Sequence, residues 1–204
     1  MGKRTVLLND RARQLLAQEA ARIIVEQGIQ DFRLAKNKAA ERLGLRDRGS
    51  LPGNSEIEEA VGEHLKLFGR EAYVSLLETM RRAALSAMEV LAPFSPRLVG
   101  PVLHGTAAAN SVVNLHVFSD TPELIAMRLD EAQLPYKTYE RRLKSRRDLA
   151  ETFAGYRFTR DDSSIEATVF PIDGMRQAPI SPVDGKPMKR ANRSAVRKLL
   201  LSRD

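Results

Sequence analysis

The middle of the chain gathers residue types that could hold a phosphate group. They are Gly100, Gly105, Thr106, Ser111, Asn114, His116 and, further along the chain, Glu166. Glycine turns allow backbone N–H groups to approach a phosphate closely, and alternate residues of a strand share one face. Because Asn114 and His116 alternate within the β-favouring run 112–118, we expect both on one face as candidate ligand-binding residues.

Composition limits the chemistry that these residues can take part in. The chain has 204 residues and no cysteine, which excludes disulfides, thiolate metal sites and cysteine nucleophiles. No apolar run has the length of a signal peptide or a membrane span, so we expect a cytoplasmic protein without a membrane partner.

The first half of the chain shows helical periodicity. Apolar residues recur at three- and four-residue steps over 9–27, 34–43 and 74–91, and a fourth helix is expected from Ser55, which forms a capping-box pattern with Glu58. Pro93 and Pro96 end this region. The first 95 residues are therefore expected to be helical.

After Pro96 the pattern changes to that of a sheet. Strands are predicted over 97–103, 112–118, 136–142, 155–160 and 164–170. A helix should run from Pro122 to about Ala132, with 119–121 as capping candidates, and a short basic helix from Arg193 to Leu201. The order predicts an α+β fold in which a helical N-terminal part packs on a small mixed β-sheet.

The turn and strand of residues 98–118 resemble the signature of the polymerase-beta-like nucleotidyltransferases. In that family a strand ends in Gly-Ser, a turn carries a second glycine, and the next strand presents Asp-x-Asp. The resemblance implies a nucleotidyltransferase-type sheet over about residues 70–173. It also implies that Gly100 and Pro101 stand at the Gly-Ser turn, and that Glu166 stands at the third acid of the family.

The acidic positions of that signature are not acidic here. They fall on Val112 and Asn114, or on Asn114 and His116 when the alignment moves by two residues. Valine has no ligand atom, asparagine offers a neutral amide oxygen, and Pro101 lacks the N–H that could meet a phosphate. We therefore assign no catalytic residue, no metal ligand and no cofactor. Mg²⁺ is expected only if displaced acids make the protein an active nucleotidyltransferase.

Three other segments resemble a bacterial family of unassigned function with a helical N-terminal part. They are Phe32–Gly44, Leu51–Ile57 and Ala92–Pro96. Some members of that family carry the label UDP-N-acetylmuramate–alanine ligase. Such a ligase needs a glycine-rich phosphate loop with Lys and Ser or Thr, and the nearest match, residues 184–187, has a proline after its lysine.

Positive charge is concentrated in the last third of the chain. The net charge is +7, and residues 137–204 hold 16 basic and 9 acidic residues, which accounts for all of the excess. Such asymmetry suits a polyanion, although a solvated basic face is also common. The candidate nucleic-acid-binding residues are Arg141, Arg142, Lys144, Arg146, Arg147, Lys189, Arg190 and Arg193.

Two rival interpretations use other parts of the chain. Residues 11–45 resemble the start of a TetR-type helix-turn-helix, but Gly49, Pro52 and Gly53 stand where a recognition helix should follow. His104 and His116 could also form an acid–base site with Asp120, Asp161, Asp162 and Glu166, although neither histidine has the spacing of a metal ligand.

The sequence thus predicts three regions. Residues 1–95 form a helical region, 96–173 a nucleotidyltransferase-like core, and 174–204 a basic tail with a short helix. The preferred function is non-catalytic binding of a nucleotide, a nucleic acid or a protein through residues 105–109 and the basic segments. The alternatives are an active nucleotidyltransferase and a DNA-binding regulator.

Overall fold

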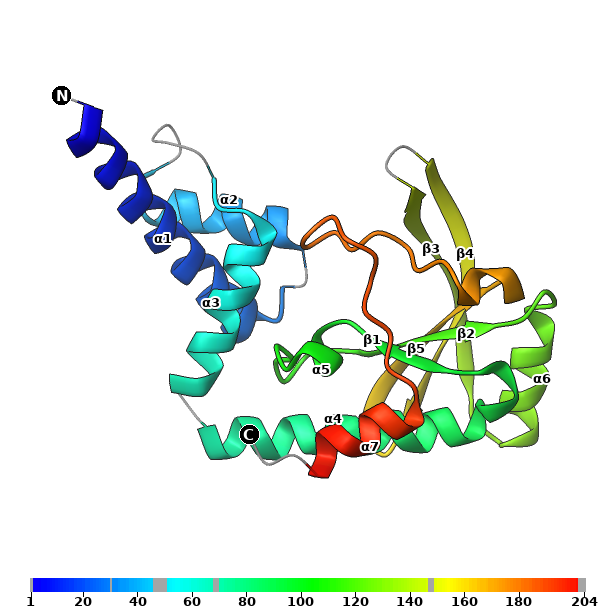
Figure 1. The fold of residues 1–204 in the computed structure, drawn as a ribbon. Helices are drawn as coiled ribbons and strands as arrows, with labels where there is room; N and C mark the ends of the chain where they lie inside the picture. The colour runs from blue at the N-terminus through cyan, green and yellow to red at the C-terminus, as the bar shows by residue number, and fades with distance from the viewer. Residues whose placement is uncertain (1, 30, 46–50, 68–69, 147–148, 202–204) are drawn as a thin grey trace. The chain divides into compact units, whose positions relative to one another are not determined.

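The computed structural model describes residues 2–29, 31–45, 51–67, 70–146 and 149–201, without the side chains of residues 2–9, 70, 145 and 146. The chain is α+β and folds into two compact units (Figure 1). The helical unit comprises residues 1–74, 108–110 and 182–184. The α/β unit comprises residues 75–107, 111–181 and 185–204. This geometric division differs from the regions 1–95, 96–173 and 174–204 expected from the sequence.

The helical unit contains α1 (Gly2–Gln27), α2 (Phe32–Arg42), α3 (Asn54–Leu67) and the first turn of α4 (Arg70–Val90). The apolar stripe of α1 packs against both α2 and α3. Leu16 and Ile23 of α1 and Ile57 of α3 are fully buried. Alanines 35 and 39 of α2 are also buried, so the backbones of α1 and α2 approach closely.

Carboxylates cap two of these helices. Asp31 accepts hydrogen bonds from the N–H groups of Arg33 and Leu34 at the start of α2. At the start of α3, Glu56 accepts from the N–H of Gly53. The expected capping box of Ser55 and Glu58 is thus wrong by position, because the helix begins at Asn54 and the Ser55 hydroxyl donates to the carbonyl of Val183 instead.

The α/β unit is built on a mixed five-stranded sheet, in the order β1-β2-β5-β4-β3. Its strands are β1 (Arg97–Val99), β2 (Val113–Phe118), β3 (Tyr136–Arg146), β4 (Leu149–Arg160) and β5 (Ser163–Phe170). Only β2 and β5 pair in parallel; the other neighbours are antiparallel.

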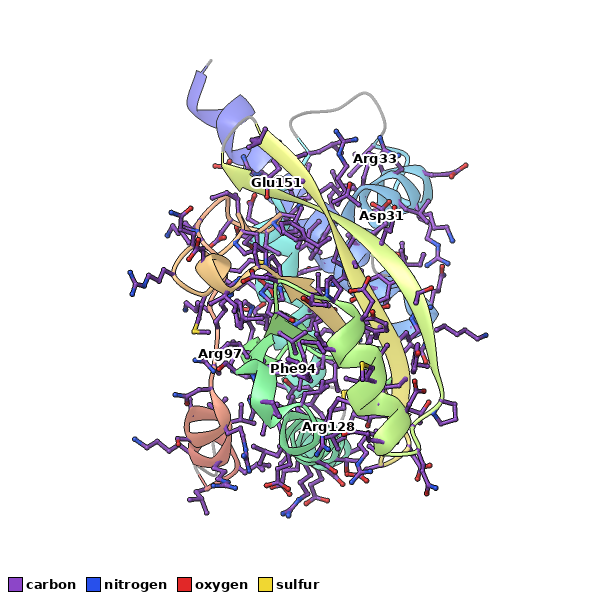
Figure 2. The ribbon with its side chains drawn as sticks, turned by 90° about the vertical axis from the view of Figure 1, so that its right-hand side faces the viewer. Asp31, Arg33, Phe94, Arg97, Arg128 and Glu151 are labelled. Carbon is purple, nitrogen blue, oxygen red and sulfur yellow. The ribbon has the colours of Figure 1, made fainter. Side chains whose placement is uncertain are left out.

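Helices cover one face of this sheet, called here the helix-covered face. α6 (Glu123–Glu131) packs there, since the hydroxyl of Tyr156 donates to the carbonyl of Pro122. α4 packs there as well, since Arg160 donates to Ser86. Arg128 of α6 donates to the carbonyl of Val90 and joins the two helices (Figure 2). The buried side chains between them form the core of the unit.

Most predicted elements of this unit are confirmed, with four corrections. The strands predicted over 136–142 and 155–160 are longer, since β3 continues to Arg146 and β4 begins at Leu149. The strand expected over 97–103 ends at Val99, and α5 (Pro101–His104) follows. Gly100 has φ of +73°, which ends the strand, and Pro101 presets the first helical φ. β2 begins at Val113 rather than Val112. α6 has Pro122 at its N-cap without a side-chain cap, so residues 119–121 do not cap it.

The chain after β5 crosses to both edges of the sheet. A short 3-10 turn, η2 (Ile172–Met175), follows β5, and the N–H of Ile180 then donates to the carbonyl of Lys144 on β3. Ala191 exchanges two hydrogen bonds with Leu98 on β1. The predicted basic helix is confirmed as α7 (Arg193–Leu201), where Arg193 pairs with Glu89 of α4. Among the described residues, no helix has both the length and the apolar character needed to cross a membrane.

Candidate functional site

The sheet face opposite α4 and α6 carries most of the buried polar side chains of the described residues. His116, Glu166 and Thr168 lie on this face, called here the polar face, and each is at most 5% exposed. The parallel register of β2 and β5 places Asn114 opposite Glu166 and His116 opposite Thr168. The expected alternation of Asn114 and His116 on one side of the strand is therefore confirmed, and Glu166 joins them.

Two arginines hold the carboxylate of Glu166. Arg157 on β4 donates from Nε and Nη2 to Oε1, and Arg141 on β3 donates from Nη2 to Oε2 at 2.5 Å. Arg157 lies directly opposite Glu166 in the β4–β5 register. Three charge-assisted hydrogen bonds thus occupy most of the lone pairs of this buried carboxylate.

Asn114 is tied to the same group. Its Oδ1 accepts from Nη1 of Arg141 at 2.8 Å, and its Nδ2 donates to the carbonyl of Val112 at 3.0 Å. Both ends of the Asn114 amide are therefore engaged. One guanidinium group thus bridges Asn114 and Glu166.

Tyr139 completes the arrangement. Its hydroxyl forms a hydrogen bond with Oγ1 of Thr168 at 2.8 Å, and the guanidinium carbons of Arg141 and Arg157 lie 5.7 and 5.9 Å from its ring centre. Burial raises the pKa of the Tyr139 phenol, so it stays protonated at neutral pH. We call these six residues the Glu166 cluster: Asn114, Tyr139, Arg141, Arg157, Glu166 and Thr168.

The Glu166 cluster carries two positive charges and one negative charge. The side chain of Arg157 is 54% exposed and that of Arg141 33% exposed, whereas the carboxylate beneath them is buried. A guanidinium group has five N–H donors, and the contacts above use two on each arginine. The remaining donors can bind an oxyanion in the fork geometry that suits carboxylates and phosphates.

A second arginine group lies further along the polar face. It comprises Arg190, His116, Phe118 and Phe170 and is called here the Arg190 cluster. Nε of Arg190 donates to Nδ1 of His116 at 3.1 Å, and its Nη1 donates to the carbonyl of Gly174 at 2.7 Å. The guanidinium carbon lies 5.0 Å from the ring centre of Phe118 and 5.1 Å from that of Phe170. Burial and the nearby charge of Arg97 lower the pKa of Arg190 to about 10. Through these hydrogen bonds and ring contacts, Arg190 holds the C-terminal segment on the sheet.

His116 is a neutral acceptor in this group. Burial lowers its pKa well below 6.5, and the charges of Arg190 and Arg141 lower the pKa further. Since Nδ1 accepts a hydrogen bond from a cation, the proton of the neutral ring lies on Nε2. His116 thus has a structural role in joining β2 to the C-terminal segment.

The other residues of the expected phosphate turns lie elsewhere. Gly100 is next to Asn114, because a Cβ at Gly100 would lie 3.6 Å from the Asn114 amide nitrogen. Gly105 ends α5 in the left-handed conformation, and Thr106 and Ser111 lie in the connection from α5 to β2. The division between the two units also passes through this connection, with 108–110 in the helical unit.

Strand alternation separates the expected basic run. Arg141 lies on the polar face, whereas Arg142 and Lys144 point to the opposite side and are exposed. Arg147 and the side chain of Arg146 lie outside the described residues. Of the C-terminal candidates, Lys189 is exposed, Arg190 is part of the Arg190 cluster, and Arg193 pairs with Glu89.

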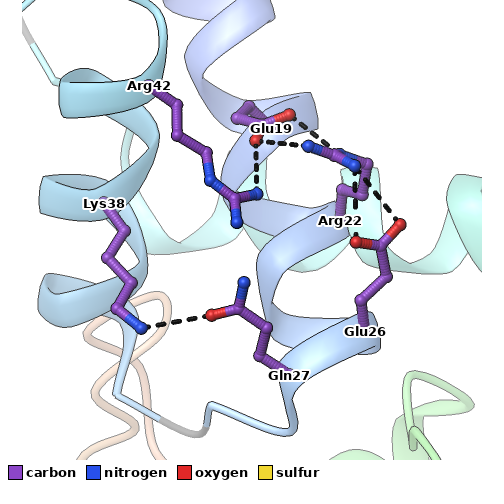
Figure 3. A network of polar contacts seen from close by, with 6 residues as sticks. All are labelled: Glu19, Arg22, Glu26, Gln27, Lys38 and Arg42. Atoms are coloured by element: carbon purple, nitrogen blue, oxygen red, sulfur yellow. Dashed lines mark hydrogen bonds and ion pairs between the residues drawn. The ribbon is translucent and has the colours of Figure 1, made fainter.

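Two basic side chains of α2, within the segment 11–45 of the helix-turn-helix interpretation, contact α1. Arg42 pairs with Glu19 at 3.1 Å, and Lys38 donates to Gln27 at 3.1 Å (Figure 3). Glu19 also pairs with Arg22, and these arginines lower its pKa. These contacts stabilise the packing of α2 on α1.

The structure brings two of the residues in the acid–base interpretation onto the same face of the sheet. His116 and Glu166 share the polar face, but Asp120 accepts from the N–H of Ile172, and Asp161 and Asp162 form the turn between β4 and β5. His104 lies in α5 and is exposed. The structure thus distributes the expected set over four places.

Sequence reasoning missed Arg157, Tyr139 and Thr168 as members of the site. The sequence holds one signal for Arg157, the pair Asp161-Asp162. In the structure these two residues have positive φ and form a two-residue hairpin turn. Counting outward from such a turn pairs Arg157 with Glu166. Tyr139 and Thr168 gave no local signal, since their meeting depends on the full strand order.

The described residues contain no group of three or more His, Asp or Glu side chains arranged to hold a metal ion. Comparison of the chain with protein-family models, with curated proteins and with solved structures gave no match.

Proposed function

We propose that this protein is a non-catalytic, nucleotidyltransferase-like protein that binds the phosphate group of a nucleotide at the Glu166 cluster. One observation carries the proposal: the carboxylate of Glu166 is buried, while the side chains of its two partners, Arg141 and Arg157, are 33% and 54% exposed. The sequence resemblance aligns Glu166 with a metal-binding carboxylate, and in this proposal the two arginines supply fixed cations in place of metal ions.

The order of the elements supports the nucleotidyltransferase part of the proposal. A strand, a glycine turn, a short helix and a second strand follow one another from β1 to β2, and the strand with the third acid lies next to β2. The register of β2 and β5 brings Asn114 beside Glu166. These are the positions from which the family directs its acids to one face.

The side chains at those positions support the non-catalytic part. Val112 lies outside β2, and the amide oxygen of Asn114 accepts a hydrogen bond from Arg141. A two-metal mechanism needs carboxylates that converge on the ions. Here one carboxylate converges on two guanidinium groups, which supply charge for binding a phosphate but do not activate a nucleophile.

Nucleotide titration by calorimetry tests this proposal. Because the cations are part of the chain, we expect ATP, GTP, CTP or UTP to bind as well in EDTA as in Mg²⁺. Arg157→Gln should weaken binding about tenfold or more, since a hydrogen bond to a charged group contributes about 1.5–3 kcal/mol. Arg142→Gln on the other side of the sheet is the matched control and should bind like the parent.

Two results would contradict the proposal. Binding that disappears in EDTA would point to a metal-dependent site and favour the active enzyme. Equal affinities of the parent and Arg157→Gln would place the nucleotide elsewhere. Arg157→Gln removes one of the two arginine partners of Glu166. It is therefore also tested together with Glu166→Gln, because the two neutral glutamines can still form a hydrogen bond with each other.

A further inference from the structure

β3 and β4 extend well beyond the rest of the sheet. The pairing of β4 with β5 ends at Gly155 and Thr168, whereas β3 and β4 stay paired up to Arg146 and Leu149. Residues 140–146 and 149–154 therefore form a projecting two-stranded element, called here the ribbon (Figure 1). Figure 2 shows Glu151 on this element, toward the end of the sheet away from Arg128.

The two sides of the ribbon differ in exposure. On the side of the polar face, Phe153 stacks with Phe170 at 4.5 Å between ring centres, and Leu143 is half-buried. The other side, called here the outer face, is exposed at every position. Its residues are Glu140, Arg142, Lys144, Ala150, Thr152 and Ala154.

The outer face combines long basic side chains with small ones. In the antiparallel register Arg142 lies opposite Thr152, and Lys144 lies opposite Ala150. A partner can therefore approach the backbone of β4 closely while the two cations of β3 reach around it. Within the described part of the chain, neither Arg142 nor Lys144 forms an ion pair.

The charge of this region favours a polyanion. Residues 137–152 contain six basic and three acidic residues. On the opposite side of the ribbon, Arg141 pairs with Glu166. On the outer face itself, the exposed Arg142 and Lys144 outnumber the single acidic residue, Glu140, and two neighbouring exposed cations are complementary to the phosphate backbone of a nucleic acid.

The shape of the ribbon and the composition of its outer face favour duplex DNA over other nucleic acids. Strands in a sheet lie about 4.8 Å apart, so a two-stranded ribbon fits a B-DNA major groove about 12 Å wide. The major groove of duplex RNA is deep and narrow. The outer face offers no aromatic side chain on which the bases of a single strand could stack.

We propose that the outer face of the ribbon docks on double-stranded DNA, with Arg142 and Lys144 contacting phosphates at the rim of the major groove. This function goes beyond nucleotide binding, because the outer face lies on the opposite side of the sheet from the Glu166 cluster. Each interaction can therefore fail without the other.

Fluorescence anisotropy across a salt series tests this docking, with duplex DNA of random sequence and two helical turns as the probe. We expect binding at low salt and a log–log slope that loses about 0.9 for each phosphate contact removed. In the double variant Arg142→Gln with Lys144→Gln the slope should flatten by roughly two, and the affinity at about 50 mM salt should fall at least tenfold.

Thr152→Glu is a second variant on the opposite strand of the ribbon. It adds a negative charge beside Arg142 at an exposed position and should weaken DNA binding while the thermal unfolding midpoint stays near that of the parent. Arg157→Gln is the matched control: it should bind DNA normally and lose nucleotide affinity, whereas the ribbon variants should do the reverse.

Three outcomes would overturn the docking proposal. They are equal affinity of parent and double variant for duplex DNA, the absence of binding at about 50 mM salt, and a preference for single-stranded DNA or duplex RNA over duplex DNA. Because nucleotide titrations are run on the same preparations, failure here with retained nucleotide binding would leave the Glu166 cluster proposal intact.

Discussion

The ring of Tyr139 on β3 lies directly over Gly155 on β4. A Cβ atom at Gly155 would fall 2.3 Å from Cζ of Tyr139, so no side chain fits beneath the ring. In this position the phenol reaches Thr168, and its face supports Arg141 and Arg157. Because Gly155 has no side chain, the Tyr139 ring can take the position in which it contacts Arg141 and Arg157 of the Glu166 cluster.

Gly155→Ala should force the ring of Tyr139 away from β4. The displaced phenol would lose its hydrogen bond to Thr168, and we expect the free energy of unfolding to fall by about 1–3 kcal/mol, as for other overpacked sites. Nucleotide affinity should fall as well, because the arginines lose their support. Urea unfolding and calorimetry measure the two effects.

A double-mutant cycle with Tyr139→Val separates strain from loss of contact. If the clash is the cause, Gly155→Ala should cost much less in the Tyr139→Val background than in the parent. An equal cost in both backgrounds would show that the clash with Tyr139 is not the source of the destabilisation.

His116 should make the stability depend on pH in a range where ordinary carboxylates are mostly ionised. The folded-state pKa of His116 lies well below its unfolded value, so the folded protein holds the neutral ring and is stabilised above the unfolded pKa. That stabilisation should be lost as the pH falls below about 6.5. Unfolding free energies should decrease by up to about 1.4 kcal/mol per pH unit between about pH 6.5 and 5.

The variant His116→Asn provides the control for this pH dependence. Asparagine keeps an oxygen that can accept from Arg190 but does not titrate, so the slope in this pH range should disappear. The surrounding charges, those of Arg190 and Arg141, remain in the variant. A slope that persists in His116→Asn would assign the proton uptake to another group.

Arg190 should hold the C-terminal segment on the sheet. Arg190→Met removes the hydrogen bonds to His116 and Gly174, and we expect faster hydrogen exchange of the amides in residues 172–191. Lys189→Met, at the exposed neighbouring position, should leave exchange unchanged. Similar exchange in both variants would show that the two hydrogen bonds between Ala191 and Leu98 hold the segment without Arg190.

The sequence predicted β2 and β5 because their apolar runs are rich in β-branched residues, whereas the polar ends of β3 and β4, residues 143–146 and 149–154, carry no such signal. It failed after Val99, where the apolar residues Val102 and Leu103 continue the strand pattern but belong to α5. The backbone decides there: Gly100 turns with positive φ and Pro101 starts a helix. Hydrophobicity alone could not distinguish the two, since a short apolar run is compatible with a buried strand or a buried helix.

The candidate site was predicted in part. Alternation within one strand is enough to pair Asn114 with His116, and the resemblance added Glu166. The partners of Glu166 come from β3 and β4, and Arg141 meets it across β4, which lies between them in the sheet. Such a contact follows from the strand order, which no local pattern encodes. Strand alternation also divides the candidate nucleic-acid-binding residues, because Arg141 lies on the polar face and Arg142 and Lys144 on the other side.

With Mg²⁺ and each nucleoside triphosphate, we expect the purified protein to release no pyrophosphate and to transfer no nucleotide. Two-metal catalysis requires at least two carboxylates directed at the ions, and Glu166 is bound to Arg141 and Arg157 while the neighbouring position is Asn114. Turnover in the parent that Glu166→Ala abolishes would contradict this and establish an active enzyme.

The same geometry predicts how a metal site could be created. Asn114 and Glu166 are paired across β2 and β5, so carboxylates at both positions could share one divalent cation. Asn114→Asp alone should bind none, because Arg141 would pair with the new carboxylate. Combined with Arg141→Gln and Arg157→Gln, it should bind Mn²⁺ in calorimetry, whereas the two arginine variants without Asn114→Asp should not. Equal Mn²⁺ binding with and without Asn114→Asp would show that positions 114 and 166 do not converge on a common ion.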